Sequence, residues 1–217
     1  MNFFSKESED IKVIHPPVLG WLEKKLSKKE MDYLWRCINN RSKKSHKSYL
    51  AGAITESNLL DDKSDWFWLN TVKPLCEKYG EKFNNIGKGA PVNQRHPYYL
   101  HEWWVNYQRQ NEFNPPHTHT GVYSFVIWMK IPTRHDEQNK NPISSNSNTQ
   151  AISTFQFSYT NILSQMESYF INMDPEMEGT MLFFPSELVH QVHPFYNCDE
   201  ERISISGNVF INTAKLL

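Results

Sequence analysis

The sequence predicts an α+β fold in which N-terminal helices support a β-sandwich or barrel of jelly-roll type. In residues 1–95, apolar residues recur at the three- and four-residue steps of helices. From residue 98 onward, short runs of aromatic and β-branched residues alternate with Gly, Pro and polar turns, which is typical of strands and hairpins. The 217 residues suffice for one core. We therefore expect a single domain over 1–217, mainly helical over 1–95, with the jelly-roll core over 96–217.

Two helices are expected in the N-terminal part. The first begins near Ser27, which is placed to cap it, and Glu30 three residues on completes a capping box. Its apolar stripe is Leu34, Trp35 and Ile38. The second begins after Asp62, and its apolar residues are Trp66, Trp68, Leu69, Val72, Leu75, Tyr79 and Phe83. Because proline lacks an N–H and crowds the preceding turn, Pro74 predicts a kink.

Strands are expected over residues 100–108, 121–131, 152–159, 180–184, 188–192 and 202–212. Glu178-Gly179 predicts the turn into the fourth of them, and Pro185-Ser186 separates the fourth from the fifth. The segment Arg134–Thr149 is polar and rich in turn residues, so we expect a mobile loop there and consider it a candidate lid.

Charge and cysteine content exclude several classes of protein. The net charge of −1 gives no strong attraction to nucleic acid or to an anionic membrane. The three cysteines form no CxxC pair, so neither a zinc ribbon nor a disulfide framework is predicted. No apolar run approaches membrane-spanning length. We expect a soluble cytoplasmic protein with free thiols.

Three histidines form the most informative pattern. His117 and His119 are two residues apart, and on an extended backbone such residues share a face with Cα atoms about 6–7 Å apart. Pro115-Pro116 favours that extended backbone. On the strand 188–192, His190 shares one face with Leu188 and Val192, whereas His193 takes the other. We expect His117, His119 and His190 to converge on one metal and the other histidines to be ordinary packing residues.

The last strand supplies a second polar feature. Arg202, Ser204, Ser206 and Asn208 occupy one face of it, and Ile203, Ile205, Val209 and Ile211 occupy the other. Such a strand is suited to line a wet pocket. Arg202 offers a planar fork matched to a carboxylate, and Ser204 adds a hydroxyl donor. The alternative for Arg202 is a surface ion pair with Glu200 or Glu201.

The order of these motifs resembles the non-haem iron, 2-oxoglutarate-dependent oxygenases, whose fold is the double-stranded β-helix, a cupin-like jelly roll. More narrowly, it is similar to a group of these oxygenases common in phages and marine bacteria. The shared elements are His117-Thr-His119, the strand Gly121–Pro132, the segment Gly179–Pro194 and the segment Arg202–Asn208. The resemblance is strong over 98–212 and looser over the N-terminal helices.

The resemblance implies a dioxygenase that uses Fe(II), 2-oxoglutarate and O2 to hydroxylate a substrate that the sequence does not identify. His117 and His190 match its iron-binding histidines, and no catalytic residue beyond the metal site is implied. Arg202 and Ser204 would bind the distal carboxylate of 2-oxoglutarate. Tyr107 matches a strand tyrosine that touches this co-substrate, while Asn106 is expected to point away. If the chain is phage-encoded, the location implied is the host cytoplasm.

His119 departs from the family pattern, because it stands where the family has Asp or Glu. The usual facial triad is two histidines and one carboxylate. We therefore interpret the site as a three-histidine centre, and the alternative is an open ligand position, as in iron halogenases. Two further classes stay open: a non-catalytic jelly-roll module with a closed metal site or a structural role, and a cupin-type three-histidine metalloenzyme without 2-oxoglutarate. A carboxylate clamp such as Arg202 and Ser204 argues against the cupin-type enzyme.

Overall fold

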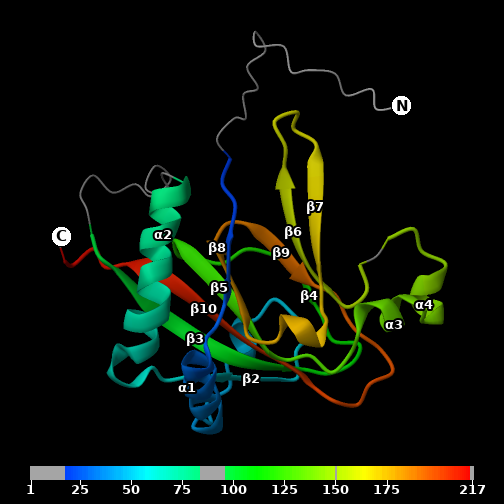
Figure 1. The fold of residues 1–217 in the computed structure, drawn as a ribbon, viewed down its shortest axis with the longest axis horizontal. Coiled ribbons are helices and arrows are strands. Elements are labelled where there is room, and N and C mark those ends of the chain that lie inside the picture. The colour runs from blue at the N-terminus through cyan, green and yellow to red at the C-terminus, as the bar shows by residue number, and fades with distance from the viewer. Residues whose placement is uncertain (1–17, 84–95, 150, 216–217) are drawn as a thin grey trace, which may run out of the picture.

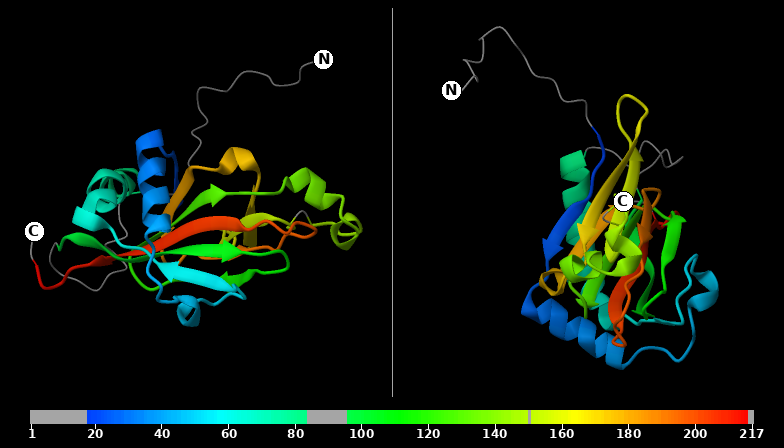
Figure 2. Two further views of the ribbon diagram at one scale, coloured as in Figure 1. Left: turned by 90° about the horizontal axis from the view of Figure 1, so that it is seen from below. Right: turned by 90° about the vertical axis from the view of Figure 1, so that its right-hand side faces the viewer.

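The computed structural model describes residues 18–83, 96–149 and 151–215, which form two antiparallel sheets and several helices (Figure 1). The larger sheet has the strand order β1 (Leu22–Lys25), β8 (Thr180–Pro185), β5 (Tyr123–Lys130), β10 (Arg202–Ile211), β3 (Tyr98–Gln108) and β2 (Glu56–Leu59). The smaller sheet has the order β4 (Asn114–His117), β9 (Val189–Val192), β6 (Thr154–Thr160) and β7 (Met166–Asn172). In the left view of Figure 2, β10 in red lies between β5 and β3 in green, with β2 in cyan at the edge.

The first helix is α1 (Lys28–Asn39), and it begins where the sequence predicts. The Ser27 side chain accepts a hydrogen bond from the backbone N–H of Glu30, and the Glu30 carboxylate accepts one from the backbone N–H of Ser27. Leu34 and Ile38 are buried against the larger sheet. The capping box and the apolar stripe of α1 are therefore both confirmed.

The second helical segment contains a π turn, η3 (Trp68–Val72), which continues into α2 (Lys73–Phe83). Asp62 precedes it and accepts hydrogen bonds from the backbone N–H groups of Phe67 and Trp68, both at 2.8 Å. Pro74 lies in the first turn of α2, directly after the π turn. The wider turn accommodates the missing N–H and the ring of the proline, so the predicted irregularity takes the form of a π turn. Short 3-10 turns are η1 (Lys47–Tyr49), η2 (Lys63–Asp65) and η4 (Pro175–Met177).

Alternation along the strands divides the interior into two layers. Odd-numbered residues of β3 and β10, such as Val105 and Ile205, pack against the helices in the larger core cluster. Even-numbered residues over 104–108 of β3 and 202–206 of β10 face the smaller sheet, whereas the register shift at Asn208 and Val209 turns Tyr98 and Leu100 toward the larger cluster. The second cluster lies between the sheets and includes Trp128, Phe155 and Phe184. The site described below occupies this space between the two sheets.

The segment Arg134–Thr149 differs from the expected mobile loop, because it contains α3 (His135–Asn139) and α4 (Pro142–Ser145). Gln138 is buried, donates to the carbonyl oxygen of Tyr196 and accepts from the backbone N–H of Tyr196, both at 2.9 Å. The backbone N–H of His135 donates to Asp174 at 2.7 Å. The polar composition of the segment predicted a loop. The residues that anchor the helices, Asp174 and Tyr196, are distant in sequence, so the local pattern could not show them. In Figure 1 the two helices lie at the opposite end of the molecule from the C-terminus.

Cys37, Cys76 and Cys198 are free thiols, as the spacing predicts. Among the described residues, no helix is both long and apolar enough to cross a membrane.

Candidate metal centre

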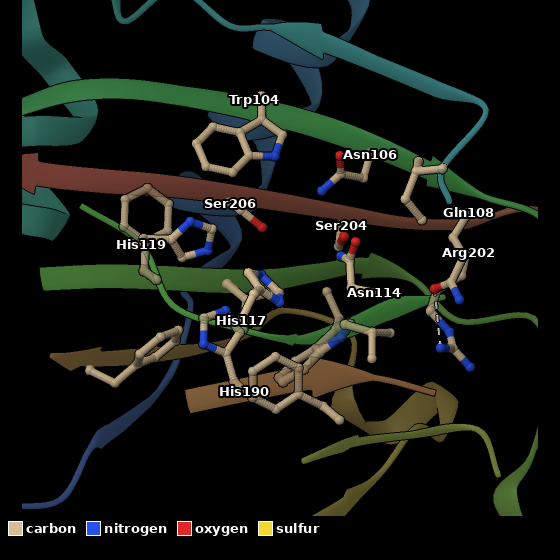
Figure 3. Close-up of a pocket in the computed structure, with 17 residues that line it drawn as sticks. Trp104, Asn106, Gln108, Asn114, His117, His119, His190, Arg202, Ser204 and Ser206 are labelled. Carbon is tan, nitrogen blue, oxygen red and sulfur yellow. Dashed lines mark hydrogen bonds between the residues drawn. The ribbon is translucent and has the colours of Figure 1, made fainter. Parts of the chain in front are cut away.

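Three histidine side chains converge between the two sheets. His117 ends β4 and is paired in register with His190 of β9, which brings their rings to 4.3 Å between centroids. His119 lies two residues further on, and its backbone N–H donates to the carbonyl oxygen of Ser186 at 2.9 Å. One donor nitrogen from each histidine lies within 4.8 Å of the other two. The strands thus bring together the three histidines that the sequence singles out (Figure 3).

Two of the imidazoles are oriented by the backbone. Nδ1 of His117 lies 2.7 Å from the carbonyl oxygen of Pro115, and Nδ1 of His190 lies 2.9 Å from that of Leu188. An N–H at each Nδ1 donates to its carbonyl oxygen, which leaves Nε2 with a free lone pair. Metal-binding histidines in proteins are typically held in this way.

Burial keeps the three histidines neutral at neutral pH. It lowers the pKa of His117, and with the neighbouring histidines it lowers the pKa of His119 to about 4. The same causes hold the pKa of His190 well below its usual value. A neutral imidazole is the form that binds a metal. The residues present therefore fit a borderline metal ion such as Fe(II), and among the described residues no carboxylate lines the cavity beside them.

A row of polar side chains extends from the histidines along β10 and β3. The two strands pair Ser206 with Trp104, Ser204 with Asn106 and Arg202 with Gln108, and all six side chains line one cavity. Figure 3 shows the histidines at one end of this row and Arg202 at the other. Each step along a strand face spans two residues, or about 6.6–6.8 Å, so two steps separate Ser206 from Arg202. Phe155 and Phe184 of the smaller cluster also line the cavity and limit access of water.

Arg202 is a buried cation without a carboxylate partner in the described chain. Its Nη2 donates to Ser153 Oγ at 2.7 Å and its Nη1 to Gln108 Oε1 at 3.3 Å, while its Nε has no partner. Burial lowers the pKa of its guanidinium to about 9. A buried charge is costly unless it is paired, so this position favours an anionic ligand. The surface ion-pair alternative is wrong, because Glu200 pairs with Lys130 and Glu201 with Arg109.

Tyr107 differs from the expectation that it touches the co-substrate. It lies in the larger core cluster, and the guanidinium of Arg41 lies 4.9 Å from its ring centroid. Successive residues of a strand point to opposite faces of the sheet. Because Trp104, Asn106 and Gln108 line the cavity, Tyr107 points to the other face. The expectation for Asn106 is wrong for the same reason, since Asn106 lines the cavity.

Sequence reasoning also missed Gln108, Asn114 and Ser153. Strand parity could have found Gln108 and Asn106, because they lie opposite Arg202 and Ser204 in an antiparallel pair. Asn114 lies three residues before His117 in a segment that the sequence shows to be extended. Ser153 carries no such signal, since its contact with Arg202 depends on how the chain returns from α4 to β6. Trp103, Trp128, Phe183 and Phe184 are buried.

Several solved structures are similar to this chain. A 2OG-Fe(II) oxygenase from Burkholderia pseudomallei has a TM-score of 0.55 at 10% identity, with 88% of this chain and 85% of that chain covered. A prolyl-4-hydroxylase from Pseudomonas putida has a TM-score of 0.51 at 13% identity, with 89% and 94% covered. A non-heme alpha-ketoglutarate-dependent epimerase from nogalamycin biosynthesis has a TM-score of 0.51 at 14% identity, with 89% and 76% covered. At these identities the likeness shows the fold, and it confirms the predicted double-stranded β-helix.

Among curated proteins no match was found. The family described as "Putative 2OG-Fe(II) oxygenase" matches residues 102–208. This segment begins in β3 and ends in β10, and it contains the three histidines, Arg202 and Ser204. Over this segment, which is about half of its length, the chain is similar to the 2OG-Fe(II) oxygenase family.

Proposed function

We propose that His117, His119 and His190 bind the Fe(II) of this oxygenase, and that Arg202 and Ser204 bind the distal carboxylate of 2-oxoglutarate. The outcome that we propose is hydroxylation of a substrate whose identity is open. When bound, the iron would activate O2, which is the oxidant: one oxygen atom would enter the substrate as a hydroxyl group and the other would enter the succinate that forms, with carbon dioxide, from 2-oxoglutarate. The chain supplies the ligand geometry, the anchoring of the co-substrate and the exclusion of water.

The observation that carries this proposal is the unpaired guanidinium of Arg202 at the far end of the histidine cavity. Its free Nε and the Ser204 hydroxyl are donors, and a carboxylate accepts from both. 2-Oxoglutarate is a short dianion whose other end chelates a metal. A co-substrate that spans from the histidines to Arg202 would neutralise the buried charge and satisfy its Nε in one step.

The three-histidine ligand set gives the proposed centre one negative charge less than a triad with a carboxylate. Three neutral imidazoles leave the full charge of Fe(II) on the metal, which favours an anionic chelating ligand beside them. The same ligand set is the one observation that favours a second candidate, a cupin-type metalloenzyme without 2-oxoglutarate. The buried Arg202 distinguishes the two, because that enzyme needs no cation at the end of its cavity.

Anaerobic titration tests the proposal directly. Protein loaded with Fe(II) is mixed with increasing 2-oxoglutarate while the visible metal-to-ligand charge-transfer absorption is followed. We expect the band to appear and saturate, and to need far more 2-oxoglutarate in Arg202→Ala. A missing band in the wild-type protein, together with unaltered 2-oxoglutarate binding in Arg202→Ala, would refute the assignment. The same result would favour either the cupin-type enzyme or a closed, non-catalytic metal site.

We also propose a narrower group of oxygenases to which the chain is similar and the place of the protein in the cell. The segments Gly179–Pro194 and Arg202–Asn208 support the group of oxygenases common in phages and marine bacteria. Free cysteines suit a reducing cytoplasm, which would be that of the host if the chain is phage-encoded. Fractionation of cells that produce the chain naturally tests the location, and recovery outside the cytoplasm would contradict it.

A further inference from the structure

Asn114 lies between the histidines and the arginine, on the opposite wall from Ser204. In the pairing of β4 with β9, His117 is opposite His190 and Asn114 is opposite Val192. Asn114 and Val192 both line the cavity. Figure 3 shows Asn114 between the histidines on one side and Arg202 on the other. A molecule that reaches from the histidines to Arg202 therefore passes this side chain.

The amide of Asn114 rests directly on Gly52. A Cβ atom added to Gly52 would lie 1.5 Å from Oδ1 of Asn114 and 2.5 Å from its Cγ. The same atom would lie 2.7 Å from the carbonyl oxygen of Phe113, which accepts a hydrogen bond from the N–H of Ala53 at 2.9 Å. Only a residue without a Cβ allows this approach. Gly52 thus leaves room for the amide of Asn114 at this place, and a larger residue at position 52 would displace it.

This contact also fixes which end of the amide is available to a ligand. Oδ1 of Asn114 is buried and has no donor among the described residues. Because the oxygen faces Gly52, the planar amide directs its NH2 group away from Gly52. The end of the amide that a molecule in the cavity can meet is therefore the NH2 group, which is a donor.

The donor character of Asn114 matches the co-substrate. Ionised 2-oxoglutarate has oxygen acceptors and no donor, so it needs N–H and O–H groups along its length. Arg202 and Ser204 offer such groups from the larger sheet, and both line the cavity. Asn114 offers one from the smaller sheet.

We propose that Asn114 donates a hydrogen bond from its amide nitrogen to 2-oxoglutarate, and that Gly52 is the positioning residue that holds the amide in this orientation. The inference rests on the proposed binding of 2-oxoglutarate between the histidines and Arg202. It adds a contact from the smaller sheet, and it assigns a role to the segment before β2 that crosses to β4 at Ala53 and Phe113.

The test is the anaerobic titration of Fe(II)-loaded protein with 2-oxoglutarate, repeated on Asn114→Ala, Asn114→Asp and Gly52→Ala. Iron affinity is measured first in each. We expect Asn114→Ala to weaken 2-oxoglutarate binding about tenfold, which is typical of one hydrogen bond to a charged group. Asn114→Asp keeps the shape but replaces the donor with a charged acceptor, so it should bind more weakly than Asn114→Ala. Gly52→Ala should resemble Asn114→Ala.

Matched controls separate the amide contact from general damage. Asn58→Ala removes another amide with a buried, unpartnered oxygen, which does not line the cavity. Gly80→Ala adds a methyl group where no atom lies within 4 Å. Both should bind 2-oxoglutarate as the wild type does.

A double variant that combines Gly52→Ala with Asn114→Ala tests whether Gly52 acts through the amide of Asn114. Asn114→Ala removes two of the three atoms that the new methyl group would meet, so Gly52→Ala should cost little further affinity in that background. Full additivity would overturn the role of Gly52, because its effect would then pass through the Phe113 carbonyl. Wild-type affinity in Asn114→Asp would overturn the role of Asn114. If the wild-type protein itself showed no band, the proposed function would fail, a result distinct from either of these.

Discussion

The guanidinium of Arg202 donates to the hydroxyl of Ser153 across 2.7 Å. Ser153 is fully buried, and its φ of 51° is in the left-handed region. Its backbone N–H donates to Pro194 and its carbonyl accepts from Met173, so the residue is fixed on both sides. The proposed clamp for the co-substrate is therefore oriented by the connection between α4 and β6 as well as by β3.

This arrangement predicts that Arg202 lowers the stability of the fold while it provides binding of 2-oxoglutarate. A buried cation without a carboxylate partner destabilises the fold, and its replacement by an apolar residue of similar length removes that cost. We expect Arg202→Met to keep or raise the thermal midpoint of the iron-loaded protein without 2-oxoglutarate. The rise in midpoint that 2-oxoglutarate gives the wild type should disappear. Thermal unfolding with and without 2-oxoglutarate measures both effects, and a variant still stabilised by 2-oxoglutarate would contradict the clamp.

His119→Asp is expected to retain or strengthen Fe(II) binding. The substitution restores the two-histidine, one-carboxylate triad and adds a negative charge beside the metal. His119→Ala should weaken binding, since it removes a ligand and supplies none. Competition titration against a chelator measures the affinities. Complete loss of metal in His119→Asp would contradict this assignment of the site, and unchanged affinity in His119→Ala would show that His119 is not a ligand.

Tyr107→Phe is expected to change 2-oxoglutarate affinity less than twofold, because Tyr107 faces the helices. Gln108→Ala should weaken it several-fold, since Gln108 lines the cavity and accepts from Arg202 at 3.3 Å. The two variants change neighbouring residues of one strand, so each serves as a control for the other. A larger loss of 2-oxoglutarate affinity in Tyr107→Phe than in Gln108→Ala would instead place Tyr107 in the co-substrate site.

Glu30 predicts how stability depends on acid. Burial alone would raise its pKa, but hydrogen bonds from Lys24, Ser27 and Thr71 outweigh this and lower the pKa from 4.5 to about 2. The folded state therefore gains stability above pH 4.5 and loses it as the pH falls toward 2. The gain is on the order of 3 kcal/mol.

Glu30→Gln should remove this part of the pH dependence. Denaturant unfolding of metal-free protein between pH 2 and pH 6 gives the free energy of unfolding for each variant. The wild-type curve should fall more steeply than that of Glu30→Gln, while Glu23→Gln, at an exposed position on β1, should follow the wild type. Parallel curves for all three proteins would contradict the contribution of Glu30.

Local patterns predicted the parts of the fold that local physics determines. The capping box of Ser27 and Glu30 and the alternation along β10 depend on near neighbours, and both are confirmed. The four-residue strands β1 and β2 were missed because they lie at or near sheet edges and their pairing depends on residues far along the chain. The edge strand β7 has apolar residues on both faces, so it shows no simple alternation.

The site residues show the same difference between features that depend on near neighbours and features that depend on distant segments. Parity selected His190 over His193, and the structure places His193 outside the histidine cluster. Tyr107 was assigned to the co-substrate site from its likeness to a tyrosine of the family. Strand alternation would have selected Gln108, which is paired with Arg202 and lines the cavity. Gly52 and Asn114 could not be paired from sequence, because their contact depends on how the segment before β2 crosses to the other sheet.

The alternation along β10 also determines which kinds of genetic change the site tolerates. Substitution at one position alters one wall and leaves the others in place. Deletion of a single residue in the middle of this strand would exchange its two faces beyond that point, moving apolar side chains toward the metal cavity and polar ones toward the helices. Among natural variants of this chain, the length of the segment from Arg202 to Asn208 should therefore stay constant even where its residues change.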